Sequence, residues 1–343
     1  MTMIPELNQP EVWLPLAFYA LLGVAMLAYV VLDGFDLGVG ILLRRADDAQ
    51  KDRMIASIGP FWDANETWLV LGVGILLVAF PMAHGVILGA LYLPVALMLA
   101  GLILRGVAFD FRVKARDDHK AAWNLAFYGG SVLATFSQGL MLGLYITGFV
   151  YEGAQLLFAI FTGLALVAGY ALLGATWLIM KAEGELQRRA IAWARGSLWL
   201  CALGVAAVSL ATPLVSQQVF DKWFAFPNLL LLAPIPVVTA ALFFITDYTL
   251  RKLPDLLAAD SHAFCWLPFA ATVGVFVLAF FGLAYSLFPY LVVDRITVWD
   301  AASAPASLKI ILAGVLIVLP TIVAYTAFSY RVFWGKAREL SYQ

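Results

Sequence analysis

Long apolar runs are the feature of this sequence that most restricts its fold. Stretches of 20 or so residues with almost no charge recur from one end of the 343-residue chain to the other, and an α-helix needs about 20 such residues to cross a bilayer. Hydrophobic residues make up 63% of the chain and charged residues only 13%, a composition too apolar for a water-soluble domain. The alternating ten-residue segments typical of membrane strands are absent from the sequence. The sequence therefore predicts an all-α polytopic membrane protein.

Charge clusters and proline or glycine turns divide the chain into about nine predicted spans. These spans cover residues 12–43, 55–81, 85–111, 121–149, 153–180, 193–215, 224–250, 263–290 and 306–333. We expect a single integral membrane domain over residues 1–343, because no connecting segment is long enough to form a soluble core. Within it, residues 12–149 are expected to form one four-helix bundle, residues 153–290 a second, and residues 306–333 a peripheral helix.

Lysine and arginine residues alternate between the two sides of the predicted spans. Of the 21 such residues, 17 follow an odd-numbered span or end the chain, in the groups 44–53, 112–120, 181–195, 251–252 and 331–338. Only Lys222, Arg295 and Lys309 lie on the other side. Because cytoplasmic loops of membrane proteins are enriched in basic residues, the N-terminus is predicted to lie outside and the C-terminus in the cytoplasm.

Several function classes are excluded for this chain acting alone. Its formal net charge of −1, with no basic stripe, predicts no nucleic-acid partner. Cys201 and Cys265 lie in separate apolar runs, while His84, His119 and His262 lie near predicted span ends. We therefore expect no disulfide, and no haem or other metal ligated by this chain. Nucleotide-binding motifs are also absent from the sequence.

Ionisable residues inside the predicted spans are the candidate functional residues, since a charge near the bilayer centre costs about 3 kcal/mol or more. Asp33 and Asp36 lie in "VLDGFDLGVG", Asp63 and Glu66 in "GPFWDANETWLVLG", and Arg105 in "LILRGVAFDFR". The spacing of three residues places each acidic pair on one helix face. Four carboxylates cannot all be ionised beside one guanidinium in an apolar interior. Some of them are therefore expected to bind protons, as a proton relay requires.

A structural role is the alternative. In that case Arg105 pairs with one aspartate, and the other carboxylates cap helix ends or line a water-filled vestibule. Trp62 and Pro60, next to Asp63, favour a shaped site there. If residues 55–81 form one continuous helix, a rise of about 1.5 Å per residue predicts Asp63 about 15 Å from the cytoplasmic face.

Glycines accompany these acidic residues along the chain. Five of them, namely Gly34, Gly38, Gly40, Gly72 and Gly74, are predicted to allow close approach between helices.

Three segments carry a family resemblance. "VLDGFDLGVGIL" at 31–42, "GPFWDANETWLVLGVGILLVAFP" at 59–81 and "LRGVAFDFR" at 104–112 resemble subunit II of the cytochrome bd-type quinol oxidases. "FPYLV" from Phe288 and "TVWDAASAPASL" from Thr297 extend the similarity to the last span. The resemblance covers most of the chain in order, and DGFD together with WDxNExWL is a specific combination.

The resemblance implies subunit II of a terminal quinol:O2 oxidoreductase of the aerobic respiratory chain, in a bacterial inner membrane. It implies a heterodimer with a larger subunit I, which ligates two b haems and one d haem and oxidises quinol. No catalytic residue is then expected in this chain, although it belongs to an enzyme. Whether a structural quinone or small accessory membrane subunits belong to the complex stays open.

The resemblance also implies roles for individual residues. Asp63 matches an aspartate associated with a proton path from the cytoplasm towards the haem d region. Four further residues are candidate members of that path: Trp62, Glu66, Asp36 and Asp33. Asp36 and Arg105 match residues associated with the integrity of the haem region in the partner subunit.

A self-sufficient proton-coupled carrier is the second hypothesis, because buried carboxylates alone would also suit one. A carrier is expected to have interrupted helices at corresponding positions of two repeated halves. The prolines within the spans correspond poorly in this respect, with Pro60 and Pro94 in spans 2 and 3 but Pro234 and Pro236 in span 7.

Overall fold

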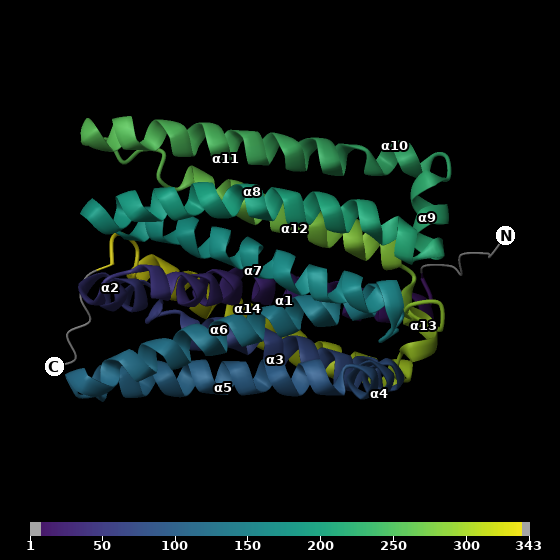
Figure 1. Ribbon diagram of the computed structural model, residues 1–343. Helices are drawn as coiled ribbons and strands as arrows, with labels where there is room; N and C mark the ends of the chain where they lie inside the picture. Colours follow the sequence, from purple (N-terminus) through teal and green to yellow (C-terminus); the bar gives the residue numbers. More distant parts are fainter. Residues whose placement is uncertain (1–7, 338–343) are drawn as a thin grey trace.

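The protein is a bundle of long helices. The computed structural model describes residues 8–337, and in that range nine helices are long and apolar enough to cross a bilayer. They lie side by side between the two ends of the molecule (Figure 1). In chain order the elements are α1 (Pro10–Leu42), η1 (Leu43–Arg45), α2 (Asp48–Ile58), α3 (Trp62–Ala79), α4 (Pro81–Ala90), α5 (Tyr92–Lys114), α6 (Asp117–Ile146), α7 (Gly153–Lys181), α8 (Gly184–Val215), α9 (Gln217–Phe224), α10 (Asn228–Leu232), α11 (Pro234–Ala258), α12 (Leu267–Leu287), β1 (Tyr290–Val292), β2 (Ile296–Thr297), α13 (Val298–Ala301) and α14 (Pro305–Val332). The predicted fold class is confirmed.

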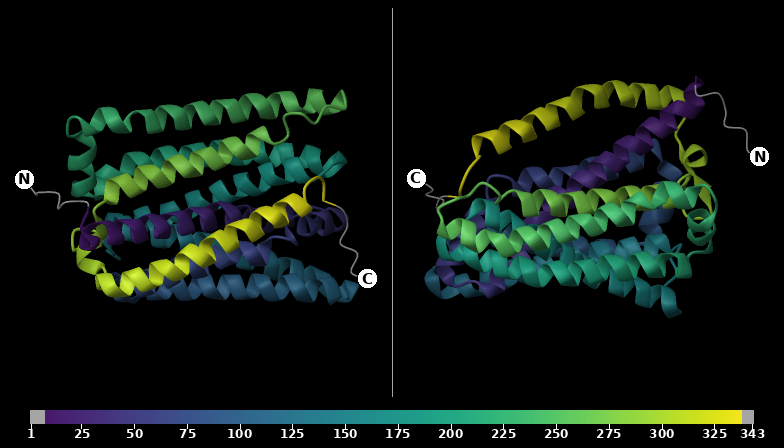
Figure 2. Two further views of the ribbon diagram at one scale, coloured as in Figure 1. Left: turned by 180° about the vertical axis from the view of Figure 1, so that it is seen from behind. Right: turned by 90° about the horizontal axis from the view of Figure 1, so that it is seen from above.

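One end of the bundle gathers basic residues. There Arg112, at the end of α5, pairs with Asp52 of α2 at 2.7 Å, and Arg189 of α8 pairs with Asp47 at 3.3 Å. We call this the basic end. Helix α1 begins at the opposite end and α14 finishes at the basic end (Figure 2), in agreement with an odd number of spans. That the basic end is cytoplasmic stays a prediction.

The second and third predicted spans are not continuous helices. Helix α2 begins after Asp47, whose side chain accepts a hydrogen bond from the Gln50 backbone, and it ends at Ile58. A turn separates it from α3, so that Asp63 lies in the first turn of a new helix. Likewise Pro81 starts α4, a separate helix of 10 residues before α5. The depth estimate for Asp63 assumed one continuous helix and therefore loses its basis.

A short hairpin and helix interrupt the all-helical pattern at the end opposite the basic end. Strands β1 and β2 pair antiparallel, with Val292 opposite Ile296. Helix α13 follows directly and is held by a capping box, in which the side chains of Thr297 and Asp300 each accept a hydrogen bond from the other's backbone N–H. The sequence predicted only a loop here, because three-residue strands have no recognisable periodicity.

Helix α1 is at the centre of the packing and contacts α3, α6 and α7. It meets α7 most closely at Gly38, where an added Cβ would overlap the backbone carbonyl of Tyr170, and a Cβ at Gly174 would overlap the backbone of Gly38. A Cβ at Gly34 would meet the Tyr170 ring. The predicted close approach is thus confirmed on α1. It is wrong for Gly74, which has no atom within 4 Å of an added Cβ.

The predicted bundles share a broad contact. Besides the contact between α1 and α7, helix α6 packs against α7 along much of its length. Helix α14 crosses the outside of α1 and α3 (Figure 2), and most of its side chains are exposed. The division at residues 12–149, 153–290 and 306–333 stays a prediction.

Candidate functional site

Arg105 is the centre of the candidate site. Its side chain, from α5, is fully buried and donates a hydrogen bond of 2.7 Å to Oδ1 of Asp33 on α1, which is also fully buried. Its other terminal nitrogen lies 3.4 Å from Oε1 of Glu66 on α3, whose side chain is 27% exposed. One guanidinium therefore joins three helices through two carboxylates.

Asp36 lies one turn after Asp33 on α1, in a neutral environment. Its carboxylate accepts a hydrogen bond of 2.7 Å from the amide of Asn65, which also donates to the Leu32 carbonyl at 3.3 Å. The amide oxygen of Asn65 in turn accepts from the Tyr330 hydroxyl of α14 at 3.2 Å. Asp36 and Asn65 are buried. This chain of hydrogen bonds connects α1, α3 and α14.

Acceptors outnumber donors in this cluster. One oxygen of each of Asp33, Asp36 and Glu66 is buried without a hydrogen-bond partner among the described residues. The same holds for two guanidinium nitrogens of Arg105. Buried carboxylates without partners are costly, since an unsatisfied buried polar group loses its hydration and gains nothing in return.

Aromatic rings enclose the polar groups. The Arg105 guanidinium lies 5.7 Å from the centroid of the Trp62 ring, and Trp62 packs on Phe109 with centroids 4.8 Å apart. On the other side, Phe61 stacks on Tyr330 at 4.5 Å. These rings lower the local dielectric and strengthen the ion pair. Trp62 thus covers one side of the Arg105 guanidinium.

Asp63 is placed differently from the other candidates. It is exposed on α3, and it makes no hydrogen bond or ion pair that joins it to another described residue. Glu66 follows one turn later on the same helix face. Apolar residues continue this face, where Val70 is 72% exposed and Leu77 is 50% exposed. Asp63 therefore lies outside the buried cluster. It is on the same face of α3 as Glu66, one turn earlier in the helix.

Two hydrogen bonds from lysine side chains to backbone carbonyls, here called the strap, fix the end of α14 near the site. Lys181 of α7 donates to the Phe333 carbonyl at 2.8 Å, and Lys336 donates to the Ala182 carbonyl at 2.8 Å. Burial lowers the pKa of Lys336 from its ordinary value. The strap holds Tyr330 where its hydroxyl reaches Asn65.

Two residues of the site were missed from the sequence. Asn65 is a neutral residue between two acidic ones, and its burial is the signal that a helical wheel could have supplied. Tyr330 is separated from Asn65 by 265 positions and sits in an apolar run. Nothing in the sequence connects the two.

The histidines do not fit a haem site. His84 lies in α4 and is partly buried, His119 is exposed at the start of α6, and His262 is exposed between α11 and α12. None of them belongs to the interior of the bundle. Among residues 8–337, no three His, Cys, Asp or Glu side chains group as a metal site. That haem is ligated only by a partner subunit stays a prediction.

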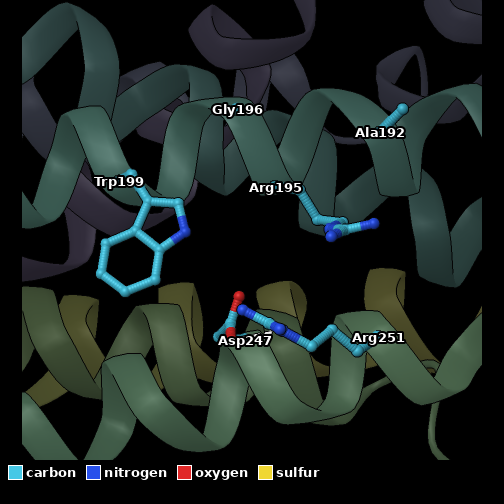
Figure 3. Close-up of a pocket in the computed structure, with 6 residues that line it drawn as sticks. All are labelled: Ala192, Arg195, Gly196, Trp199, Asp247 and Arg251. Atoms are coloured by element: carbon cyan, nitrogen blue, oxygen red, sulfur yellow. Dashed lines mark hydrogen bonds and ion pairs between the residues drawn. The ribbon is translucent and has the colours of Figure 1, made fainter.

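A second set of charged residues lies between α8 and α11. Arg195 and Trp199 project from α8 towards Asp247 and Arg251 of α11 (Figure 3). They line an open pocket of about 350 Å³, in which Arg251 pairs with Asp247 at 2.7 Å. These helices carry none of the candidate proton-path residues, so the pocket is separate from the site around Arg105.

Comparison with known proteins shows which family this chain belongs to. The family profile of cytochrome bd terminal oxidase subunit II matches residues 14–333. This chain belongs to the cytochrome bd oxidase subunit II family. Cytochrome bd-I ubiquinol oxidase subunit 2 of Escherichia coli (strain K12) is 27% identical over 365 residues, covering 93% of this chain and 94% of the relative. Cytochrome bd ubiquinol oxidase subunit 2 of Bacillus subtilis (strain 168) is 27% identical over 340 residues, with coverages of 92% and 94%.

The fold agrees with this membership. The chain is similar to a chain in the structure of bd oxidase from Geobacillus thermodenitrificans, with a TM-score of 0.77, 19% sequence identity and coverages of 94% and 99%. The predicted family is confirmed by the profile match over residues 14–333. A subunit II of a bd oxidase is part of an oxidoreductase and a multi-pass protein of the bacterial inner membrane, and this weighs against the self-sufficient carrier.

Proposed function

We propose that this chain is subunit II of a quinol:O2 oxidoreductase of the aerobic respiratory chain, and that it supplies protons from the basic end to a haem-bearing subunit I. Two relatives of similar length named as ubiquinol oxidase subunits support the reaction class. The haems, two b and one d, would be held by subunit I, where electrons pass from quinol to O2. The part of this chain is to bind, hold and pass protons.

The observation that carries the proposal is the charge imbalance around Arg105. A single guanidinium contacts Asp33 and Glu66, while among residues 8–337 Asp36 accepts a hydrogen bond from the neutral Asn65 amide and is in no ion pair. Charges in an apolar interior persist only when they are paired and hydrogen-bonded. A proton bound by the cluster would remove excess negative charge and supply the donor that its unpartnered oxygens lack. The cluster is therefore suited to hold an exchangeable proton.

The position of Asp63 supports a direction for the path. Asp63 is exposed in the first turn of α3, which a short turn connects to α2 of the basic end. Glu66 lies one turn further along, in contact with the Arg105 ion pair. A proton taken up at Asp63 would pass to Glu66, with Trp62 covering the guanidinium. Asp33 and Asp36 complete the buried end of the path.

The exposed face of α3 supports contact with the partner. An acidic side chain facing lipid is costly, and this cost disappears when water or a protein partner covers it. The face that holds Asp63 continues into exposed Val70 and Leu77, which suit an apolar subunit interface. Arg105 and Asp36 would support the partner indirectly, because their bonds hold α1, α3, α5 and α14 in register.

The experiment that tests this function is a spectrum of the purified chain. The chain is tagged in its native membrane, purified in mild detergent and measured as a reduced-minus-oxidised difference. We expect haem b and haem d bands to co-purify with it in stoichiometric amounts. A colourless chain recovered in full yield, without a larger membrane subunit, would contradict the proposed partnership.

A further inference from the structure

A groove on another face of the bundle is not used by the proposed function. It runs between the end of α1 and helices α6, α7 and α8, and its volume is about 680 Å³. Helices α6, α7 and α8 lie next to one another in the bundle (Figure 1). The size is within the range of sites that bind an organic ligand.

Small residues form the floor of the groove. Ala165 and Ala168 of α7 line it together with Gly204 of α8, and an added Cβ at Gly204 would lie 2.8 Å from the Ala165 methyl group. Larger apolar side chains stand beside them, with Leu200 59% and Leu203 64% exposed. The result is an apolar channel along the outside of the bundle.

Two arginines form the mouth of the groove at the basic end. Arg44 and Arg45 line it and are exposed, and no ion pair joins either of them to a carboxylate of the described residues. The Arg44 guanidinium lies 5.8 Å from the centroid of the ring of Tyr128, a residue that also lines the groove. Arg189 donates to the Arg45 carbonyl at 2.8 Å, which fixes the backbone of this turn.

The pocket between α8 and α11 provides a contrast. There Arg251 is already neutralised by Asp247 at 2.7 Å, as Figure 3 shows. The charge at the mouth of the groove has no such internal partner. Two adjacent guanidinium groups with a neighbouring tyrosine are suited to a phosphate, since arginine presents several donors to its oxygens.

We propose that this groove binds one anionic phospholipid from the leaflet at the basic end. The lipid phosphate lies on Arg44 and Arg45, and an acyl chain lies along Ala165, Ala168 and Gly204. The apolar floor selects a lipid over free phosphate, and the two unpaired positive charges select an anionic headgroup over a zwitterionic one. Basic pockets between membrane helices recognise anionic lipids on this physical basis.

The test uses the intact oxidase complex, delipidated in detergent and analysed by native mass spectrometry. Phosphatidylglycerol and phosphatidylcholine with the same acyl chains are added separately, and inorganic phosphate is added as a competitor. The variants are Arg44→Gln with Arg45→Gln, which removes the mouth charge, and Ala168→Phe, which fills the channel. The matched control is Arg53→Gln with Arg188→Gln, which removes two charges from exposed positions that do not line the groove.

We expect one phosphatidylglycerol to bind wild type about tenfold more tightly than phosphatidylcholine, and millimolar inorganic phosphate not to displace it. Both groove variants should lose at least 80% of the bound phosphatidylglycerol, while the control keeps it. Undiminished binding to either groove variant, equal binding of the two lipids, or displacement by inorganic phosphate would overturn the proposal. Because Ala168→Phe leaves both arginines in place, the channel is tested even if the double variant fails to assemble.

Discussion

Arg105 and Asp33 lie 72 positions apart in the chain and form an ion pair of 2.7 Å in which neither side chain is exposed. The pair joins α5 to α1 at the depth where Glu66 reaches the same guanidinium from α3. The attraction between two buried charges offsets their desolvation cost only when the pair is intact, since either partner left alone would be an uncompensated buried charge. Stability and the proposed proton chemistry therefore depend on the same residues.

Replacement of Arg105 by Leu should prevent assembly of a stable complex. The change leaves Asp33 buried without a cation, at a cost of about 3–5 kcal/mol. Arg105→Lys should assemble in part, because the charge is kept but the second contact, to Glu66, is weakened. The yield and thermal stability of the detergent-purified complex measure both effects. Wild-type stability of Arg105→Leu would show that the ion pair does not hold these helices.

Asn65→Leu should destabilise the protein by about 1–3 kcal/mol, because Asp36 would lose the side-chain donor that Asn65 provides while remaining buried. Tyr330→Phe should cost less, about 1 kcal/mol, since it removes one hydrogen bond to a neutral amide. Unfolding midpoints of the two variants give the comparison. A larger loss of stability in Tyr330→Phe than in Asn65→Leu would contradict the assignment of Asn65 as the donor that stabilises buried Asp36.

The crossing of α1 and α7 can be tested at its glycine. Gly38→Ala should cost about 1–3 kcal/mol or more, because the methyl group meets the Tyr170 carbonyl and the backbone must move apart. Gly74→Ala is the matched control, since an added Cβ there has no neighbour within 4 Å, and it should be neutral or slightly stabilising. Equal effects of the two changes on thermal stability would contradict the observed packing.

The orientation of the chain predicts which residues an impermeant thiol reagent reaches in intact cells. In a background without Cys201 and Cys265, cysteine at Asp48 or Glu185 should be protected from the reagent. Both positions are exposed at the basic end, and this end is predicted to face the cytoplasm. Cysteine at Gln217, exposed at the opposite end, should react. Permeabilised cells provide the control, in which all three should be labelled. The reverse pattern would invert the assigned direction of the proton path.

Much of the architecture could be predicted because bilayer physics acts on the sequence directly. The number of spans follows from the lengths of the apolar runs, and the distribution of basic residues indicates that this number is odd. The spacing of three residues placed Asp33 and Asp36 on one helix face. Breaks within a span were missed. The turn between α2 and α3 contains Gly59 and Pro60, a pair that marks turns, but the prediction of one continuous span did not use this signal.

The buried site could be predicted in its charges but not in its neutral members. Arg105 and the acidic residues were conspicuous, because charge in a span is expensive. Asn65 and Tyr330 cost little there, so their pairing becomes visible only when α14 is placed beside α3. The exposure of Asp63 was also unpredictable, because helical spacing puts it with Glu66 but does not say which direction that face points.

The most direct test of the proton-uptake proposal is the rate of quinol-driven O2 consumption per haem d in Asp63→Asn. The amide keeps the shape of the side chain but cannot titrate. We expect normal assembly and haem spectra with a rate at least tenfold lower, equivalent to about 1.4 kcal/mol in the limiting barrier. Asp63→Glu should keep part of the rate, and Asp48→Asn, at an acidic position 90% exposed near Lys51, should keep all of it. A normal turnover per haem d in Asp63→Asn would contradict the account and mean that protons reach the partner by another route.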